Sequence, residues 1–312
     1  MKLVIQIPCY NEEKTLPLVI KEIPKKIQGI GEIIILVIDD GSIDNTEKIA
    51  KELGCTVIKN KRNLGLAKSF KKGLEYCLSI NADFMINTDG DNQYQGKYIK
   101  NIVEELINNK ADIVIGDRQT QKIKHFSPLK KILQKFGSFT VSYISNIKIK
   151  DTVSGFRGYS REAMYNINIT SNFSYVLDSL IQASKKDLLI NEIKVKTNPP
   201  TRESRLFKNM FEHVIKSGIE ISRVYFLYEP FKTFLILSSF FIISGIFLLV
   251  RFFYYYILGI NGLVQSLIIS SLLFGFGFIL LAIAIIGDIL SKNRKINEEI
   301  LYYKKKEFFD KK

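Results

Sequence analysis

Two carboxylates separated by a single glycine are the side chains of this chain best placed to do chemistry. The apolar run Phe84-Met85-Ile86 leads into Asp89, Gly90 and Asp91, and Gln93 follows. Residues two positions apart in an extended backbone point the same way, so both carboxylates would face one ligand. Their oxygens suit Mg2+ or Mn2+, which leave coordination positions open for substrate phosphates. The plainer alternative is an acidic turn in which an aspartate caps the next helix.

The elements that would position these carboxylates alternate regularly. Apolar, β-branched runs predict strands at residues 3–7, 33–38, 56–58, 84–87, 112–115 and 190–195. Helical patterns predict helices at residues 15–27, 46–53, 67–78, 96–108 and 129–144. A continuously apolar strand such as 33–38 requires a parallel sheet that is covered on both faces. The alternation therefore predicts an α/β domain with a doubly wound sheet.

Polar residues collect where these predicted strands end. The segments that follow the strands are Pro8 to Glu13, Asp39 to Ser42, Asn60 to Gly65, Asp89 to Asp91 and Gly116 to Arg118. Open α/β sheets bind ligands at the carboxyl ends of their strands. The chain has neither a dinucleotide-binding glycine motif after the first strand nor a phosphate-binding P-loop. A phosphate ligand would therefore be held by metal and arginine.

The chain changes character near residue 233. Residues 233–250 and 263–287 contain no charged side chain, and the first run would span about 27 Å as a helix, close to the thickness of a bilayer core. An aromatic cluster lies between the runs, and lysines and arginines crowd their outer flanks. This charge asymmetry predicts an integral membrane protein with both termini and the α/β domain in the cytoplasm. Residues 204–228 mix basic and apolar side chains at helical spacing, which predicts helices on the membrane surface.

The composition limits the classes of partner. The 312 residues carry a net charge of +14, which fits an anionic membrane surface or phosphorylated substrates. Zinc-finger spacing and a soluble basic stripe with aromatic residues are both absent, so we expect no nucleic acid partner. The three cysteines are scattered, as expected of buried thiols in a reducing compartment. The N-terminal residues have no cleavage site and are expected to form the first strand rather than a signal peptide.

Five motifs, in this order, carry a resemblance to a known family. They are Ile7-Pro8-Cys9-Tyr10-Asn11-Glu12-Glu13, Asp39-Asp40-Gly41-Ser42, Asn63-Leu64-Gly65, Asp89-Gly90-Asp91-Asn92-Gln93 and Asp151-Thr152-Val153-Ser154-Gly155-Phe156-Arg157. Together they resemble inverting family 2 glycosyltransferases. More narrowly, the chain is similar to the polyprenyl-phosphate hexose synthases, including dolichol-phosphate mannose synthases and bacterial undecaprenyl-phosphate glycosyltransferases. The resemblance implies a Rossmann-like GT-A fold, and it extends to the two predicted spans.

The resemblance also implies roles for individual residues. Donor-binding positions would be Pro8, Tyr10, Asn11, Glu12, Asp39, Asp40, Ser42, Asp89 and Gly90. Ligands of Mg2+ or Mn2+ would be Asp89, Asp91 and Gln93. Catalytic positions would be Asp91, Asp151 and Arg118, and acceptor-phosphate positions Arg118, Lys130, Arg157, Arg202 and Arg205. Position 130 is commonly arginine in the family, and residues 201–205 lack a glycine that the family has there.

The expected function is transfer of a hexose, with inversion, from a UDP- or GDP-sugar to a polyprenyl phosphate. The expected regions are a catalytic domain at 1–203, surface helices at 204–232, a two-helix hairpin at 233–290 and a basic tail at 291–312. Gly245, Gly275 and Gly277 would permit close helix contacts, including those of a homo-oligomer.

Other functions would require other features. A processive polysaccharide synthase would resemble this domain, but the chain lacks tryptophan and has only two predicted spans. Transfer to a neutral lipid hydroxyl would need a base, for which Asp178 is the candidate, although we expect a carboxylate at a helix surface or N-terminus there. A non-catalytic, membrane-tethered nucleotide-sugar-binding protein is the third alternative.

Overall fold

The computed structural model describes residues 1–120, 149–169, 175–199, 228–260 and 262–311, together with residues 138, 142, 218, 219, 222, 223 and 226. It divides into two compact units, Met1–Ile221 with Leu301–Lys312, and Ser222–Ile300. The predicted helix at 129–144 lies outside the described residues, apart from 138 and 142. Most of the predicted surface helices at 204–232 also lie outside them.

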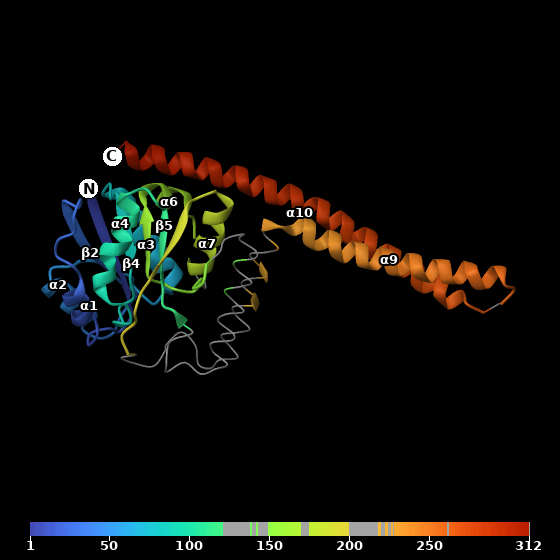
Figure 1. Cartoon of the computed structure of the whole chain (residues 1–312), viewed down its shortest axis with the longest axis horizontal. Coiled ribbons are helices and arrows are strands. Elements are labelled where there is room, and N and C mark those ends of the chain that lie inside the picture. Colours follow the sequence, from blue (N-terminus) through green and yellow to red (C-terminus); the bar gives the residue numbers. More distant parts are fainter. Residues whose placement is uncertain are drawn as a thin grey trace. The chain divides into compact units, whose positions relative to one another are not determined.

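A mixed sheet forms the centre of the first unit (Figure 1). Its strands are β1 Lys2–Cys9, β2 Glu32–Asp39, β3 Thr56–Lys59, β4 Phe84–Asn87, β5 Ile113–Asp117, β6 Arg157–Ser160 and β7 Ile190–Lys194. Their order across the sheet is β3-β2-β1-β4-β6-β5-β7. The six predicted strands are confirmed, with ends that differ by one or two residues.

One strand departs from the parallel arrangement that we expected. β6 runs antiparallel to β4 and to β5, whereas the other paired strands run parallel. Its sequence, Arg157-Gly158-Tyr159-Ser160, has no apolar run and so gave no strand signal. Because β6 starts beside the ends of its neighbours, Arg157 lies opposite both Asn87 and Ile115.

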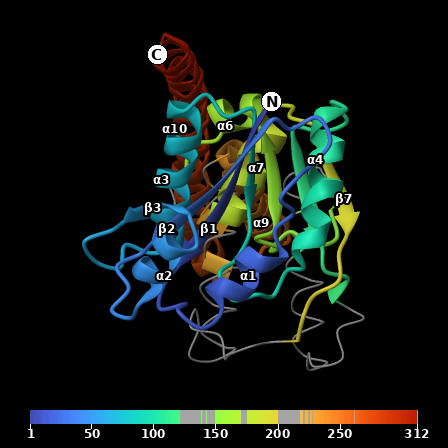
Figure 2. The ribbon, with the colours of Figure 1, turned by 90° about the vertical axis from the view of Figure 1, so that its left-hand side faces the viewer.

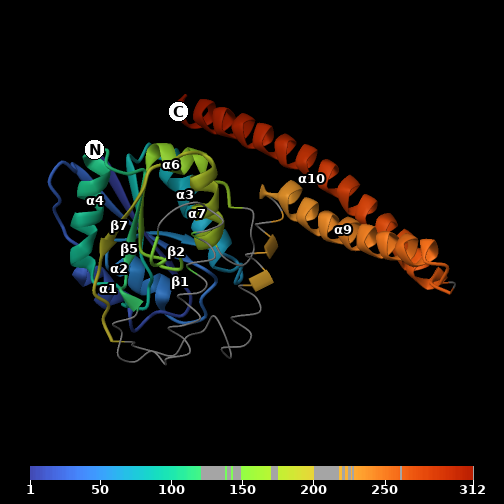
Figure 3. The ribbon, with the colours of Figure 1, turned by 45° about the vertical axis from the view of Figure 1, so that its right-hand side comes forward.

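Helices cover both faces of the sheet (Figures 2 and 3). They are α1 Leu16–Glu22, α2 Thr46–Glu52, α3 Leu66–Ser79, the short 3-10 helix η1 Gly96–Tyr98, α4 Ile99–Ile107, α6 Arg161–Asn166 and α7 Tyr175–Lys185. α1 and α4 pack on the alternate β1 residues Leu3, Ile5 and Ile7. On the other face, Phe70 of α3 stacks on Tyr175 of α7 and meets Tyr159 of β6 edge-on. Burial on both faces explains why these strands are continuously apolar.

The second unit contains two long apolar helices that lie side by side (Figure 1). α9 Pro230–Ile257 and α10 Val264–Asp310 are each long and apolar enough to cross a membrane. Ser238 Oγ donates to the Gly277 carbonyl at 2.7 Å, and Ser270 Oγ donates to the Gly245 carbonyl at 2.8 Å. Gly245 and Gly277 thus allow close contact between the helices, while a β-carbon on Gly275 would meet nothing within 4 Å.

The C-terminal end of α10 packs within the first unit, against α6. Asp310 accepts a hydrogen bond from Arg161 Nη2 at 2.9 Å, and Lys305 Nζ donates to the Ile167 carbonyl at 2.8 Å. Burial lowers the pKa of Lys305 to about 8. The segment that we expected to be a basic tail is therefore helical as far as Asp310.

Candidate active site

The ends of β1, β2 and β4 meet at one edge of the sheet and bring three of the motifs together. Cys9 pairs with Asp39 across β1 and β2, and Gln6 pairs with Asn87 across β1 and β4. The Asp89–Asp91 loop lies directly on the end of β1, because a β-carbon built on Gly90 would lie 2.9 Å from Cys9 Sγ. Glycine is needed here for close packing of the loop.

Two loops at this edge are held to each other by hydrogen bonds. Asn11 has a φ of +56°, its backbone N–H donates to Ser42 Oγ at 2.9 Å, and its Oδ1 accepts from Ile43 N at 2.9 Å. Glu12 N donates to Thr46 Oγ1 at 2.8 Å. The predicted donor-binding residues Asn11, Glu12 and Ser42 therefore form one surface. Half-buried Pro8 and Tyr10, which is 37% exposed, lie beside it in the chain.

Asp39 has an unusual environment for a carboxylate. It is fully buried, and its Oδ1 accepts from Ser42 N at 2.9 Å. Among the described residues, nothing donates a hydrogen bond to its buried Oδ2, and Lys59 Nζ lies 3.8 Å away. A buried carboxylate oxygen without a donor costs free energy. A ligand N–H that reached this oxygen would recover that cost.

Asp40 has a different role from its neighbour. Its Oδ1 accepts from Asn60 Nδ2 at 2.7 Å and from Leu64 N at 2.9 Å, and its Oδ2 accepts from Gly65 N at 2.8 Å. The carboxylate thus shapes the loop before α3. It was predicted to bind the donor, and the structure places its oxygens on the protein backbone and on Asn60.

Neighbouring residues support the Asp-Gly-Asp loop, residues 89–91, which is predicted to bind the metal. Asp91 Oδ1 accepts from Gln93 N at 3.0 Å. A β-carbon built on Gly155 would lie 3.2 Å from both Asp89 Oδ1 and Tyr175 Oη, so the Asp89 carboxylate rests against Gly155. Asn87 Nδ2 donates to Tyr175 Oη at 2.8 Å and to the Gly155 carbonyl at 2.9 Å. The antiparallel strand β6 is what brings the loop before it, with Gly155, to this place.

Arg118 and Asp151, which were predicted separately, form a two-pronged ion pair. Arg118 Nε donates to Asp151 Oδ2 at 2.7 Å and Nη2 donates to Oδ1 at 2.9 Å. The side chains are 9% and 2% exposed. Burial acts to raise the pKa of Asp151, but the adjacent Arg118 guanidinium outweighs it and holds that pKa below its usual value. Among the described residues, none accepts a hydrogen bond from Arg118 Nη1.

Asp89 interacts electrostatically with residues on both sides of the site, around Cys9 and at Arg118. Burial raises the pKa of the Cys9 thiol, and the carboxylates of Glu12, Asp39 and Asp89 raise it further. Asp89 and Asp151 also interact electrostatically with the Arg118 guanidinium. The Asp-Gly-Asp loop also packs against both regions, since a β-carbon on Gly90 would lie 2.9 Å from Cys9 Sγ and one on Gly155 would lie 3.2 Å from Asp89 Oδ1.

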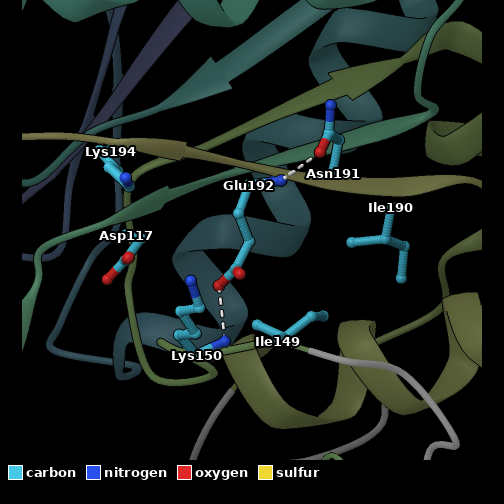
Figure 4. A pocket seen from close by; sticks show the side chains of 7 residues that line it. All are labelled: Asp117, Ile149, Lys150, Ile190, Asn191, Glu192 and Lys194. Atoms are coloured by element: carbon cyan, nitrogen blue, oxygen red, sulfur yellow. Dashed lines mark hydrogen bonds between the residues drawn. The ribbon is translucent and has the colours of Figure 1, made fainter.

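Glu192 is a supporting residue that the sequence interpretation missed. Its Oε1 accepts from Lys150 N at 2.7 Å and from Asp151 N at 3.2 Å, and it lines a pocket of about 200 Å³ beside Asp117 (Figure 4). Burial raises the pKa of Glu192, and Asp117 adds to the effect. Within the strand pattern Ile190-Asn191-Glu192-Ile193 nothing marks it out.

Two assignments need correction. Arg157 was expected to bind acceptor phosphate, but it is fully buried and donates to the Ser154, Val176 and Thr152 carbonyls. Those bonds make it a scaffold for the loop before β6. Asp178 lies in the first turn of α7, at the helix N-terminus as expected. It is not on the helix surface, because it is buried and accepts from Gln182 Nε2 at 2.7 Å. The acceptor residues Lys130, Arg202 and Arg205 lie outside the described residues.

The residues present fit a divalent cation that shares its coordination with a substrate. Within the described part of the chain, no group of three histidine, cysteine, aspartate or glutamate side chains could hold a metal alone. Asp89 and Asp91 offer hard oxygen donors from one short loop, and Gln93 follows. Mg2+ and Mn2+ are commonly held by one or two carboxylates together with substrate phosphates.

Comparisons with known proteins identify the family. The model of the family "Glycosyl transferase family 2" matches residues 4–167. The chain is 28% identical over 213 residues to the UDP-N-acetylglucosamine–dolichyl-phosphate N-acetylglucosaminyltransferase of Methanococcus voltae, covering 61% of this chain and 83% of that one. It is 30% identical over 192 residues to the dolichol-phosphate mannosyltransferase of Pyrococcus furiosus, covering 58% of this chain and 53% of that one.

A solved structure shows the same fold. Glucosyl-3-phosphoglycerate synthase from Mycobacterium tuberculosis, in complex with Mn2+, UDP-glucose and phosphoglyceric acid, superposes with a TM-score of 0.56 at 18% identity, covering 70% of this chain and 79% of that one. The family model spans more than half of this chain and includes all five motifs in full. The chain belongs to glycosyl transferase family 2.

Proposed function

We propose that this protein moves a hexose from UDP- or GDP-hexose to a polyprenyl phosphate in the membrane, with inversion and with Mg2+ or Mn2+. The observation that carries the proposal is the position of Asp89. Its neighbour Gly90 packs against Cys9 Sγ, next to Asp39 in the sheet, and the Asp89 carboxylate rests against Gly155, in the same loop as Asp151, which pairs with Arg118. A donor diphosphate at the Asp-Gly-Asp loop would then lie between a nucleoside site and a guanidinium suited to phosphate.

The donor side would recognise the nucleoside. Asp39 Oδ2 is a buried acceptor without a described donor, and a base or ribose could supply one. Asp89, Asp91 and Gln93 would hold the metal next to the diphosphate. When bound, the metal would neutralise charge on the departing nucleoside diphosphate. Uracil and guanine both carry ring N–H groups, so this feature supports either nucleotide.

The acceptor side would hold the second phosphate. Transfer breaks the bond from the anomeric carbon to the diphosphate oxygen and forms one to an oxygen of the acceptor phosphate. That phosphate is already anionic near neutral pH, so no strong base is required. Arg118, kept oriented by Asp151, would place it, with Lys130, Arg202 and Arg205 as the further predicted contacts.

Two apolar helices are consistent with an acceptor that stays in the bilayer. Relatives are named for transfer to dolichyl or dolichol phosphate. The flanking charges support cytoplasmic termini and a cytoplasmic catalytic domain. A cysteine placed near Gly259 should then be labelled from outside intact cells and one near Lys304 should not. The reverse pattern would overturn the orientation and the cytoplasmic donor.

The direct test offers a panel of UDP- and GDP-sugars to membranes that contain the protein and analyses lipid products by mass spectrometry. We expect one hexosyl phosphoprenol, absent from Asp91→Asn membranes and lost in EDTA. Wild-type membranes that form no sugar-phosphate lipid from any donor would overturn the proposal. Transfer to a lipid hydroxyl would instead favour the alternative acceptor class.

A further inference from the structure

We propose that Asn198 is a positioning residue that ties the metal-binding loop to the segment leading into the predicted acceptor-phosphate loop. This inference rests on the proposed function. Asn198 N donates to the Gln93 carbonyl at 2.9 Å, its Nδ2 donates to the Asn92 carbonyl at 3.0 Å, and its Oδ1 accepts from Gln95 Nε2 at 3.0 Å. One asparagine thus holds three of the four residues that follow Asp91.

The loop needs such support because its own backbone is irregular. Asn92 has a φ of +59°, in the left-handed region that few residues other than glycine adopt readily. The segment 88–95 lies between β4 and η1 and belongs to neither. The Gln93 amide also donates to Asp91 Oδ1. Residue 198 bonds Gln93 through its backbone N–H, while the Asn198 side chain bonds Asn92 and Gln95 on either side of it. The side chain therefore helps to keep Gln93, and with it the Asp91 carboxylate, in place.

A second set of contacts supports the other carboxylate, Asp89. Tyr94 forms a β-bridge with Thr197, and its ring stacks on Phe156 with centroids 5.0 Å apart. Tyr94 Oη accepts from Gly155 N at 3.2 Å. Since Gly155 is the residue against which Asp89 rests, residues 197 and 198 support both carboxylates of the metal-binding loop.

Glu22 of α1 connects Asn198 to the residue after the loop. Its Oε2 accepts from Gly96 N at 3.0 Å, and its Oε1 accepts from Asn198 Nδ2 at 3.4 Å. Asn198 also stands three residues before Thr201, where the predicted acceptor loop begins. A change of this side chain should therefore loosen residues 92–96 and weaken metal binding. A purely structural polar residue would lower stability without that effect on metal affinity.

The test compares Asn198→Ala with the matched control Asn191→Ala in the full-length protein in detergent. Asn191 lies on the strand that leads to Asn198, and among the described residues its side chain bonds only Glu105 and the Glu192 amide. Mn2+ binding is measured by electron paramagnetic resonance with UDP or GDP, whichever the wild type binds. Supporting residues around a metal site typically change its affinity by about 10–100-fold, and we expect about tenfold weaker Mn2+ binding for Asn198→Ala and no change for the control.

A second readout needs no metal. Hydrogen exchange of amides in residues 88–98 of the metal-free protein should speed up in Asn198→Ala and stay at the wild-type rate in Asn191→Ala. Unaltered exchange and Mn2+ affinity would overturn the inference, as would equal effects in both variants. If Asn198→Ala fails to fold, Asn198→Asp serves instead. It keeps the acceptor for Gln95, loses the donor to Asn92 and faces Glu22, so it should weaken Mn2+ binding at least as much.

Failure of the inference and failure of the proposed function are distinguishable. Normal Mn2+ binding by a folded Asn198 variant rejects the inference alone. If the wild-type protein binds Mn2+ with nucleotide but makes no sugar-phosphate lipid, the proposed acceptor is rejected and the positioning role of Asn198 is not. Wild-type protein that binds no Mn2+ rejects both.

Discussion

The two sides of the site solve the problem of a buried carboxylate in opposite ways. On the donor side, Asp39 is fully buried and its Oδ2 receives no hydrogen bond from the described residues. On the acceptor side, Asp151 is almost as buried but is paired with Arg118 through two hydrogen bonds and accepts a third from the Arg118 amide. The first arrangement leaves a carboxylate oxygen, Asp39 Oδ2, to which a ligand can donate a hydrogen bond. The second keeps a guanidinium charged, oriented and partly engaged before any phosphate arrives.

The comparison has a physical lesson. A buried carboxylate oxygen that receives no hydrogen bond is costly even with the Lys59 ammonium 3.8 Å away, whereas a hydrogen-bonded ion pair becomes costly mainly when a single partner is removed. Substitutions at Asp39 should therefore affect ligand binding more than folding. Substitutions at Arg118 should affect both.

The largest effect is expected between the two sides, at Asp91. Asp91→Asn should reduce transfer by about 10²–10³-fold, the range for removing one pre-organised group that stabilises developing charge. EDTA should do the same to the wild type, with recovery on adding Mg2+ or Mn2+. The assay is product formation with the identified donor, and the exposed Asp187→Asn serves as control. Full activity in EDTA would reject the metal assignment.

Arg118→Met should cause the largest loss of stability. It leaves the Asp151 carboxylate buried and unpaired, for which we expect a loss of about 3–5 kcal/mol in the free energy of unfolding. Adding Asp151→Asn should recover part of it, since no unpaired charge remains. Denaturant unfolding of the two variants measures the difference. Equal stability of Arg118→Met and the wild type would show that the pair is not a buried unit in solution.

The same variant should reverse the pH dependence that Asp151 contributes. In the wild type the folded-state pKa of Asp151 is lowered, so its stabilisation is present above the unfolded pKa of about 3.9 and lost as the pH falls through the lower folded value. Without Arg118, burial raises that pKa. The deficit of Arg118→Met should then shrink as the pH is lowered from 8 towards 5, which thermal unfolding across that range would reveal.

Asp39→Asn should separate binding from stability. The asparagine can keep an oxygen for the Ser42 amide while removing the charged oxygen that lacks a donor. We expect nucleotide affinity to fall by about tenfold or more, since hydrogen bonds to charged groups contribute about 1.5–3 kcal/mol. The melting temperature of the ligand-free protein should stay the same or rise. Calorimetric titration with UDP and GDP measures the affinity, and a melting curve measures the stability. A clear loss of stability would show that the Asp39 carboxylate stabilises the ligand-free fold.

Glu192→Gln should have the smallest effect. Glutamine keeps an oxygen for the Lys150 and Asp151 amides, so activity should change less than about twofold, whereas Glu192→Ala should lower it further. The folded-state pKa of Glu192 is raised, so its contribution to stability is present below the ordinary glutamate pKa and lost as the pH rises through the folded value. Because the side chain is partly solvated, Glu192→Gln should remove only a shallow pH dependence of the free energy of unfolding. Thermal unfolding between pH 4 and 7 would detect it.

The gathering of the predicted donor residues at one edge of the sheet could be foreseen, because these residues follow apolar strands directly. Asp39, Asp89 and Asp91 each stand within four residues of a strand end, and parallel strands bring those ends together. Arg157 was misjudged because an arginine inside a motif looks the same whether it faces a ligand or three buried carbonyls. Glu192 and Asn198 were missed because their hydrogen-bond partners are distant in the sequence. Asp151 is 41 residues from Glu192, and Gln95 is 103 residues from Asn198.

The amino-acid sequence by itself determined which segments form the apolar strands and helices, that two helices are apolar enough for a membrane, and which short motifs carry oxygen ligands. These are local properties of pattern and residue type. The tertiary structure decided that β6 runs antiparallel between β4 and β5 and so delivers Gly155 to Asp89. It also decided that Arg118 pairs with Asp151 while Arg157 is buried, and that Asn198 hydrogen-bonds to the residues that follow the Asp-Gly-Asp loop. Such contacts depend on which distant segments share an edge of the sheet, and no spacing along the chain encodes that.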